Sequence, residues 1–215
     1  MSEKPILFSG AMVRAILDGR KTLTRRIIKF VNGFVPKEVI EFKPDCLGKP
    51  TWVFAGTING DPAEEWVSPR YQSRDILCVK ETWAETCDEY GSPIIVYRAD
   101  NAAFYIGENQ ILAPCEAAWS LDNYPAHGKW RPSIFLPKWA WRIKQPVLSV
   151  RPERLQDITE DDIMEEGVTL LPQHINLVHS FWTLWDSING KTHPWAANDW
   201  VWRYEFRRRE NPKHV

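Results

Sequence analysis

Residues 16–26 read Ile-Leu-Asp-Gly-Arg-Lys-Thr-Leu-Thr-Arg-Arg and join the end of a helix to an extended segment. Upstream, Ser9 precedes Gly10-Ala-Met-Val-Arg-Ala-Ile-Leu-Asp18, and a serine at this place is typical of a helix N-cap. Apolar residues at helical spacing and Gly19 predict a short amphipathic helix that ends there. The chain after it is predicted to be extended, with residues 22, 24 and 26 on one side and residues 21, 23 and 25 on the other.

The composition is that of a folded chain with balanced charge. The 215 residues include 27 Lys and Arg and 28 Asp and Glu, which gives a formal net charge of −1. This balance argues against a histone-like binder of polyanions, whose charge is basic overall. The hydrophobic fraction of 44% and the charged fraction of 26% argue against intrinsic disorder. The 12 tryptophans, against 9 Phe and 6 Tyr, indicate an aromatic core or a surface built for stacking.

The sequence lacks signals for export, membrane insertion or metal binding. The N-terminus opens with charge and has no apolar signal region, and no apolar stretch approaches about 18 residues. The four cysteines show no C-x-x-C spacing, and the five histidines do not cluster. We therefore expect a soluble cytoplasmic protein with reduced thiols, no metal site, no cofactor and no membrane contact.

Strand-like runs dominate most of the chain. We predict strands at 51–55, 75–83, 94–98, about 140–151 and 199–206. Residues 30–72 carry five prolines and residues 100–128 are irregular, so both are interpreted as loop-rich insertions. Because no clean Pro/Gly linker divides the chain, we expect a single domain over 1–215 with a basic tail at 207–215 that frays. The pattern favours the α+β class, a mixed sheet or small barrel with short flanking helices.

Two further helices are predicted in the last third of the chain. Thr159 is a candidate N-cap for residues 160–166, with Asp162 at the capping-box position and Gly167 ending the turn. Apolar residues at i, i+3, i+4 spacing predict a helix over about 175–188. Core periodicity is assigned to four tryptophans, which are Trp182, Trp185, Trp200 and Trp202.

Basic and acidic residues are segregated along the chain. Residues 20–29 and 129–144 each hold five Lys or Arg and no acid, and the second segment interleaves three tryptophans. Residues 153–166 hold seven acids. Basic and aromatic groups in one groove attract a polyanion and stack on bases, at roughly 1–3 kcal/mol per stacked base. The alternative is that these charges are solvated and the tryptophans belong to the core.

The segment at 16–26 resembles the opening of the ASCH domain (activating-signal-cointegrator homology). The mark of that family is a short helix ending in Gly, then (Arg/Lys)-Lys-Thr-x-Thr-x-Arg, which residues 19–26 match. Further segments are similar to longer, phage-type members, namely 79–83, 97–98, 129–133, 150–155, 163–167, 185–189, Trp195 and Trp200. The resemblance covers roughly residues 5–206.

This resemblance implies a PUA-like fold, a β-barrel with flanking helices and a cleft beside the first helix, and it implies binding of RNA or nucleotides. One small bacterial member is an amidohydrolase that removes the acetyl group from acetylcytidine with a Lys, a Thr and a Glu, and another member is a ribonuclease. Carried over to the matching positions, the catalytic residues are Lys21, Thr24 and Glu166, with Glu165 as the alternative acid.

The cleft implied by the resemblance has a defined set of expected substrate contacts, which are Arg20, Thr22, Arg25, Arg26, Glu81, Trp83, Trp130, Arg131 and Ser133. Burial and neighbouring arginines would lower the pKa of Lys21, whose neutral amine could then activate Thr24 or a water while Glu166 holds the lysine or shuttles the proton. On a regular extended chain Lys21 and Thr24 face opposite sides, so both reach one cleft only if the segment turns or bulges.

Each of these residues also has a structural interpretation: a backbone-satisfying threonine, a solvated lysine, or a surface carboxylate on a helix. Three function classes follow. The first is a domain that binds RNA, a nucleotide or a modified nucleoside in the cleft. The second is a hydrolase that uses the cleft, as an amidohydrolase on acetylated cytidine or as a ribonuclease. The third is a non-catalytic phage accessory protein that acts through protein contacts.

Overall fold

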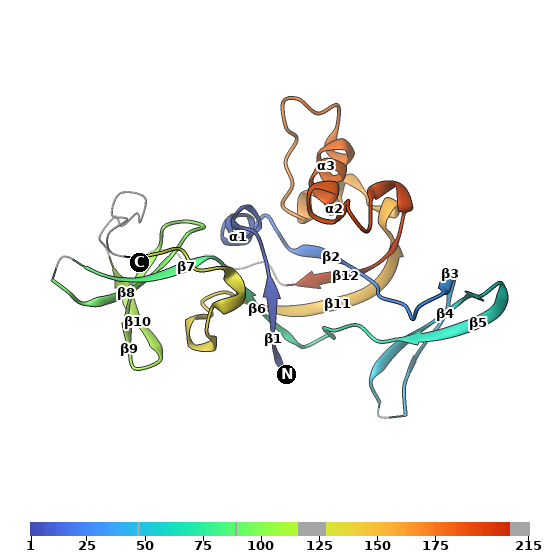
Figure 1. The fold of residues 1–215 in the computed structure, drawn as a ribbon, viewed down its shortest axis with the longest axis horizontal. Coiled ribbons are helices and arrows are strands. Elements are labelled where there is room, and N and C mark those ends of the chain that lie inside the picture. Colours follow the sequence, from blue (N-terminus) through green and yellow to red (C-terminus); the bar gives the residue numbers. More distant parts are fainter. Residues whose placement is uncertain (47, 89, 116–127, 207–215) are drawn as a thin grey trace. The chain divides into compact units, whose positions relative to one another are not determined.

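The computed structural model describes residues 1–215 except 47, 89, 116–127 and 207–215 (Figure 1). The described residues hold twelve strands in three sheets and three short α-helices. They pack into two compact units, of which unit 1 comprises Met1–Arg20 and Ile76–Pro146, and unit 2 comprises Lys21–Asp75 and the described part of Val147–Arg207. The single domain over residues 1–215 stays a prediction.

Unit 1 begins with a strand and a helix. β1 (Glu3–Leu7) pairs in parallel with β6 (Ile76–Lys80), and β6 is antiparallel to the first residues of β11 (Lys144–Arg154). α1 (Gly10–Leu17) follows β1, and the side chain of Ser9 accepts a hydrogen bond from the backbone N–H of Met12. Gly19 has a φ of 71°, a value that favours glycine, which confirms the predicted end of the helix.

The rest of unit 1 is a four-stranded antiparallel sheet in the order β10-β9-β8-β7. Its strands are β7 (Trp83–Cys87), β8 (Pro93–Tyr97), β9 (Ala103–Gly107) and β10 (Gln110–Cys115). The expectation that 100–128 is irregular is therefore wrong up to residue 115, and residues 116–127 lie outside the described residues. The short 3₁₀ helices η2 (Ser133–Phe135) and η3 (Lys138–Ala140) bring Leu136 and Ala140 against Trp83 in the core.

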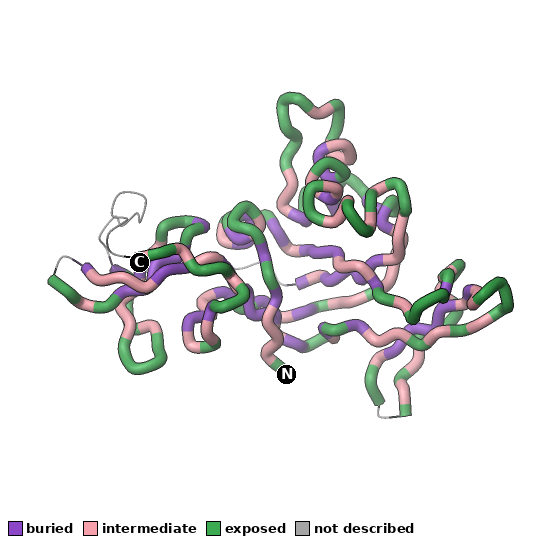
Figure 2. Tube along the Cα trace, in the orientation of Figure 1, coloured by how far each residue is buried: buried purple, intermediate pink, exposed green. Residues whose placement is uncertain are grey.

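Unit 2 contains an antiparallel sheet in the order β11-β12-β2, formed by residues 147–154 of β11, β12 (Trp200–Phe206) and β2 (Leu23–Ile27). α2 (Glu160–Glu165) and α3 (Leu177–Asn189) pack against it through an apolar cluster in which Ile163, Phe181 and Val201 are buried. Figure 2 shows the buried residues that run along β2 and β12. The 3₁₀ helices η4 (Leu155–Asp157) and η5 (Trp195–Ala197) lead into α2 and β12.

The expected loop-rich insertion at 30–72 is wrong, because this part of unit 2 forms a three-stranded antiparallel sheet. Its strands are β3 (Phe34–Pro44), β4 (Pro50–Ile58) and β5 (Asp61–Val67). Prolines are compatible with strands at ends, edges and bulges. Pro44 ends β3, Pro50 begins β4, Pro62 lies on the edge strand β5, and Pro36 stands beside a register shift.

Aromatic residues join this sheet to β12. Trp52 of β4 meets Trp202 edge-on with ring centroids 5.0 Å apart, and Phe54 meets Trp200 at 5.4 Å. Such pairs stabilise a core beyond their buried area, by about 0.5–1.5 kcal/mol each. Trp52, Trp200 and Trp202 therefore serve packing in this unit.

Two details of the sequence-based fold need correction. The three sheets do not form the closed barrel that was expected, although the α+β class agrees with a β-rich chain that carries short helices. Trp182 is 43% exposed, because α3 buries only the face that carries Phe181 and Trp185. No helix of the described residues has the length and apolar character needed to cross a membrane.

Candidate functional site

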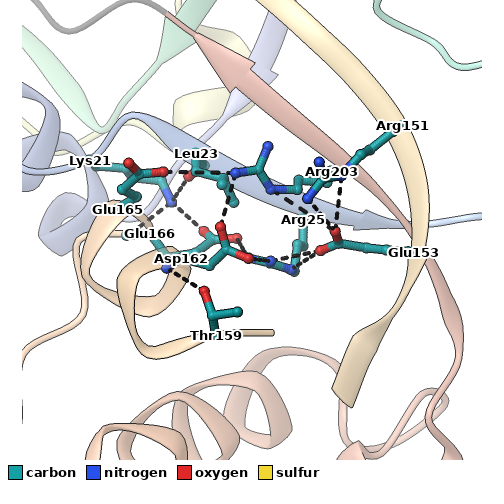
Figure 3. A network of polar contacts seen from close by, with 10 residues as sticks. All are labelled: Lys21, Leu23, Arg25, Arg151, Glu153, Thr159, Asp162, Glu165, Glu166 and Arg203. Atoms are coloured by element: carbon teal, nitrogen blue, oxygen red, sulfur yellow. Dashed lines mark hydrogen bonds and ion pairs between the residues drawn. The ribbon is translucent and has the colours of Figure 1, made fainter. Parts of the chain in front are cut away.

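Lys21 and Glu166 meet in the interior of unit 2. Lys21 stands two residues before β2, and its side chain is fully buried. Its Nζ donates hydrogen bonds to the backbone oxygen of Leu23 at 2.7 Å, to the backbone oxygen of Glu166 at 2.9 Å and to Glu166 Oε2 at 2.6 Å (Figure 3). Since an ammonium group has three protons, each of them has an acceptor here.

Burial controls the protonation of this lysine. Removal from water disfavours the charged form and lowers the pKa of Lys21, and the Glu166 carboxylate acts in the opposite direction. The nearby guanidinium groups of Arg26 and Arg25 lower it further. The net effect is a pKa below the usual range for lysine, so the neutral amine costs less free energy here than in water.

Local sequence signals place the carboxylate. The Thr159 hydroxyl accepts a hydrogen bond from the backbone N–H of Asp162 at the N-terminus of α2, as the capping pattern predicts. Glu166 is the C-cap residue, and Gly167 follows with a φ of 81°. Of the two acids that were expected as partners of Lys21, Glu166 makes the contact. Glu165 is half-exposed and lies 3.8 Å from Arg203.

Two arginines hold the acidic side chains around this pair. The Arg25 guanidinium is buried and lies 2.6 Å from Glu153 and 2.7 Å from Asp162, with Nη1 at 3.4 Å from Glu166 Oε1. Arg203 of β12 donates to the second oxygen of Asp162 at 2.9 Å. Burial alone would raise the pKa of the Asp162 carboxyl, but Arg203 and Arg25 hold it below its usual range.

Thr24 lies on the other face of the sheet. Residues alternate along β2, so its side chain points away from the face on which Arg25 reaches Glu166. Thr24 is buried and stands opposite Tyr204 in the register of β2 and β12. Thr22 and Arg26 share this face and are half-buried. Burial raises the pKa of Tyr204 and of the neighbouring Tyr71.

The other expected substrate contacts belong to unit 1, and the charged ones among them have local partners there. Arg20 pairs with Asp18 at 2.9 Å. Arg131 lies over the ring of the buried Trp83 at 4.8 Å, and Arg98 lies over Trp130 at 5.5 Å. Ser133 is the first residue of η2.

Glu81, another expected substrate contact, is buried in unit 1. Arg142 donates to both of its carboxylate oxygens at 2.8 Å and to Asp100 at 2.8 and 2.9 Å. The guanidinium also lies 4.1 Å from the ring centre of Tyr97. The buried carboxylate of Glu81 is therefore paired with a cation within unit 1.

Sequence reasoning did not assign Glu153, Asp162 and Arg203 to the surroundings of Lys21. The available signal was the complementary charge of residues 20–29 and 153–166, because a basic segment without acids and an acidic segment with few bases are suited to pair. Within the described ranges, no group of three or more His, Cys, Asp or Glu is placed to hold a metal ion. No family model, curated protein or solved structure matches the chain.

Proposed function

We propose that this chain is an ASCH-type protein of PUA-like fold that binds a modified pyrimidine nucleoside and hydrolyses an amide bond on it at Lys21 and Glu166. The observation that carries the proposal is a fully buried lysine whose Nζ lies 2.6 Å from a buried carboxylate. The lysine stands in the segment that resembles the ASCH motif, and the glutamate stands at the position carried over from the acetylcytidine amidohydrolase. The two residues are 145 positions apart in the sequence, so their contact does not follow from sequence proximity.

The chemistry follows from the environment of the pair. In a site removed from water, transfer of the proton from Nζ to Glu166 Oε2 replaces two charges by two neutral groups. The amine can then accept a proton from a water that attacks the amide carbonyl. The proton on Glu166 passes to the leaving nitrogen as the C–N bond breaks, so acetate and the free amine of cytidine are the products.

The distribution of paired charges supports a small substrate over a nucleic-acid polymer. In the basic segment 129–144, Arg142 pairs with Glu81 and Asp100, and Lys138 and Lys144 both pair with Glu3. A polymer groove depends on unneutralised cations that release counterions from phosphates. A neutral nucleoside has no phosphates and therefore needs no unpaired cations. We therefore rank the amidohydrolase above the ribonuclease.

The proposal of a PUA-like fold rests on the resemblance and on one topological feature. β2 contains the second half of the motif residues and pairs with the last strand, β12, so this half of the motif is part of the antiparallel sheet of unit 2. An antiparallel sheet with α2 packed near its edge supports the proposal.

The test is hydrolysis of acetylcytidine, followed by chromatographic separation of cytidine. We expect turnover by the wild-type chain and a loss of at least about 100-fold in Lys21→Met and Glu166→Gln, since acid–base groups contribute roughly that much. Glu160→Gln, on the exposed first turn of α2, is the matched control and should retain full activity. No turnover by the wild type, or equal turnover by folded variants, would refute the proposal. Degradation of labelled RNA by the wild type and not by these variants would favour the ribonuclease.

A further inference from the structure

Unit 2 has a cavity whose lining includes neither Lys21 nor Glu166. Its volume is about 530 Å³, within the range of about 300–1,000 Å³ that is usual for small-molecule sites. Its walls come from residues 28–30 after β2, the start of β3, the end of β11 and residues 193–200. Lys29, Val35 and Ala197 are exposed, so the cavity is open to solvent beside them.

The wall is aromatic on one side. Phe30 and Phe34 lie with ring centroids 5.5 Å apart, and Trp200 completes this part of the lining. The guanidinium of Arg154 lies over the Trp200 ring at 4.5 Å. Aromatic rings and a guanidinium plane are the groups on which a flat heteroaromatic ring stacks.

The charge of the lining is positive. It contains Lys29 and Arg154 as cations and Asp199 as the one carboxylate, which leaves a formal charge of +1 with His193 neutral. Arg154 is held in place, because it donates to the backbone oxygens of Asn198 and Pro36 at 3.2 and 3.3 Å. Lys29 stands at the exposed rim, where an anionic group of a ligand can reach it.

A histidine and an aspartate supply acceptors in the same cavity. His193 Nδ1 lies 2.8 Å from Asp199 Oδ2, and a carboxylate only accepts, so Nδ1 carries the proton. In the neutral ring Nε2 is then an acceptor. The histidine backbone is fixed, since Trp185 Nε1 donates to its oxygen at 2.8 Å. Acceptors of this kind suit the hydroxyl groups of a sugar.

We propose that this cavity binds a nucleoside monophosphate, with the base against the aromatic wall, the sugar hydroxyls near His193 and Asp199, and the phosphate at Lys29. The recognised chemistry is a flat ring that carries both hydroxyl donors and an anionic group. The proposal does not depend on the hydrolase assigned to Lys21 and Glu166, because no lining residue belongs to that pair.

The experiment is calorimetric titration of the full chain with UMP, uridine, inorganic phosphate and benzoate. We expect UMP to bind most tightly, and Lys29→Ala to weaken UMP by about 10- to 100-fold through loss of one charge-assisted hydrogen bond. Lys29→Arg should restore most of the affinity, and Phe30→Leu should weaken UMP and uridine alike. Lys49→Ala, an exposed lysine outside the lining, is the matched control and should leave the affinity unchanged.

Four results would overturn the proposal. If uridine bound as tightly as UMP, the phosphate group would contribute nothing to the affinity. If benzoate bound as tightly as UMP, the cavity would recognise a simple aromatic acid and not a nucleotide. If UMP bound with equal affinity to the wild type and to Lys29→Ala, Lys29 would not contact the phosphate. If UMP did not bind at millimolar concentration, the cavity would not be a nucleotide site. Hydrolase activity is not a readout, so its absence leaves these outcomes unaffected.

Discussion

Replacing Lys21 by methionine tests the central interaction of unit 2. Methionine keeps an unbranched side chain that is one atom shorter, and it removes the ammonium group. The side chain of Glu166 is 6% exposed and forms ion pairs with Lys21 at 2.6 Å and with Arg25 at 3.4 Å. Of these two pairs, the variant keeps only the longer one, with Arg25. The backbone oxygens of Leu23 and Glu166 also lose a donor. The variant therefore leaves a buried carboxylate and two carbonyls without the contacts that Lys21 supplied.

The expected fall in the free energy of unfolding follows from these lost contacts. Removing one partner of a buried ion pair costs about 3–5 kcal/mol, because the other charge stays buried. The double variant Lys21→Met/Glu166→Leu leaves neither charge and loses the contacts to the two carbonyls, at about 1 kcal/mol each. We therefore expect the free energy of unfolding to fall by about 3–5 kcal/mol in the single variant and by about 2 kcal/mol in the double variant.

The assay is equilibrium unfolding in urea at 25 °C, followed by far-ultraviolet circular dichroism. A second readout is pH. The folded-state pKa of Lys21 lies below 10.5, so the unfolded chain binds more protons in the interval between the two values, and the wild type should gain stability relative to Lys21→Met as pH rises toward 10.5. A loss below about 1 kcal/mol, or a double variant less stable than the single one, would refute the reasoning.

Three further predictions concern other parts of the chain. The pKa of Asp162 is lowered, so its contribution to stability is present above pH 3.8 and lost as pH falls through the folded pKa; Asp162→Asn should show a flatter acid unfolding curve than the wild type. Gly56→Ala would place Cβ 2.2 Å from the Val35 backbone oxygen and should cost about 1–3 kcal/mol in urea unfolding, whereas Gly10→Ala, with 3.7 Å to its nearest neighbour, should change stability by less than about 1 kcal/mol. Arg142→Met leaves Glu81 buried and should cost about 3–5 kcal/mol, and an unchanged midpoint would contradict the importance of that ion pair.

Helix ends were the most predictable part of the fold. Ser9 and Thr159 cap α1 and α2, and Gly19 and Gly167 follow these helices with positive φ, all as the sequence predicts. Each signal acts within about one helical turn, so no distant contact is needed to read it. The helix predicted over about 175–188 begins later, at Leu177, because Asn176 caps α3 and leaves Ile175 outside, 88% exposed.

The sheet at 34–67 could not be recognised in this way. Its prolines resemble loop signals, and only the pairing of β3, β4 and β5 shows that they occupy an edge, the ends of strands and a bulge. Similarly, helical spacing places Trp182 with core residues, but exposure depends on which side of α3 meets the sheet. Periodicity defines a face and leaves open what covers it.

The sequence by itself determined the helix caps, the alternation along residues 21–27 and the complementary charge of two distant segments, because each is set by neighbouring residues or by composition. Only the tertiary structure decided that Lys21 meets Glu166, 145 residues away, and that Thr24 faces Tyr204 instead. The physical reason is that strand pairing and burial select partners from the whole chain, while alternation allows only one face of β2 to reach α2.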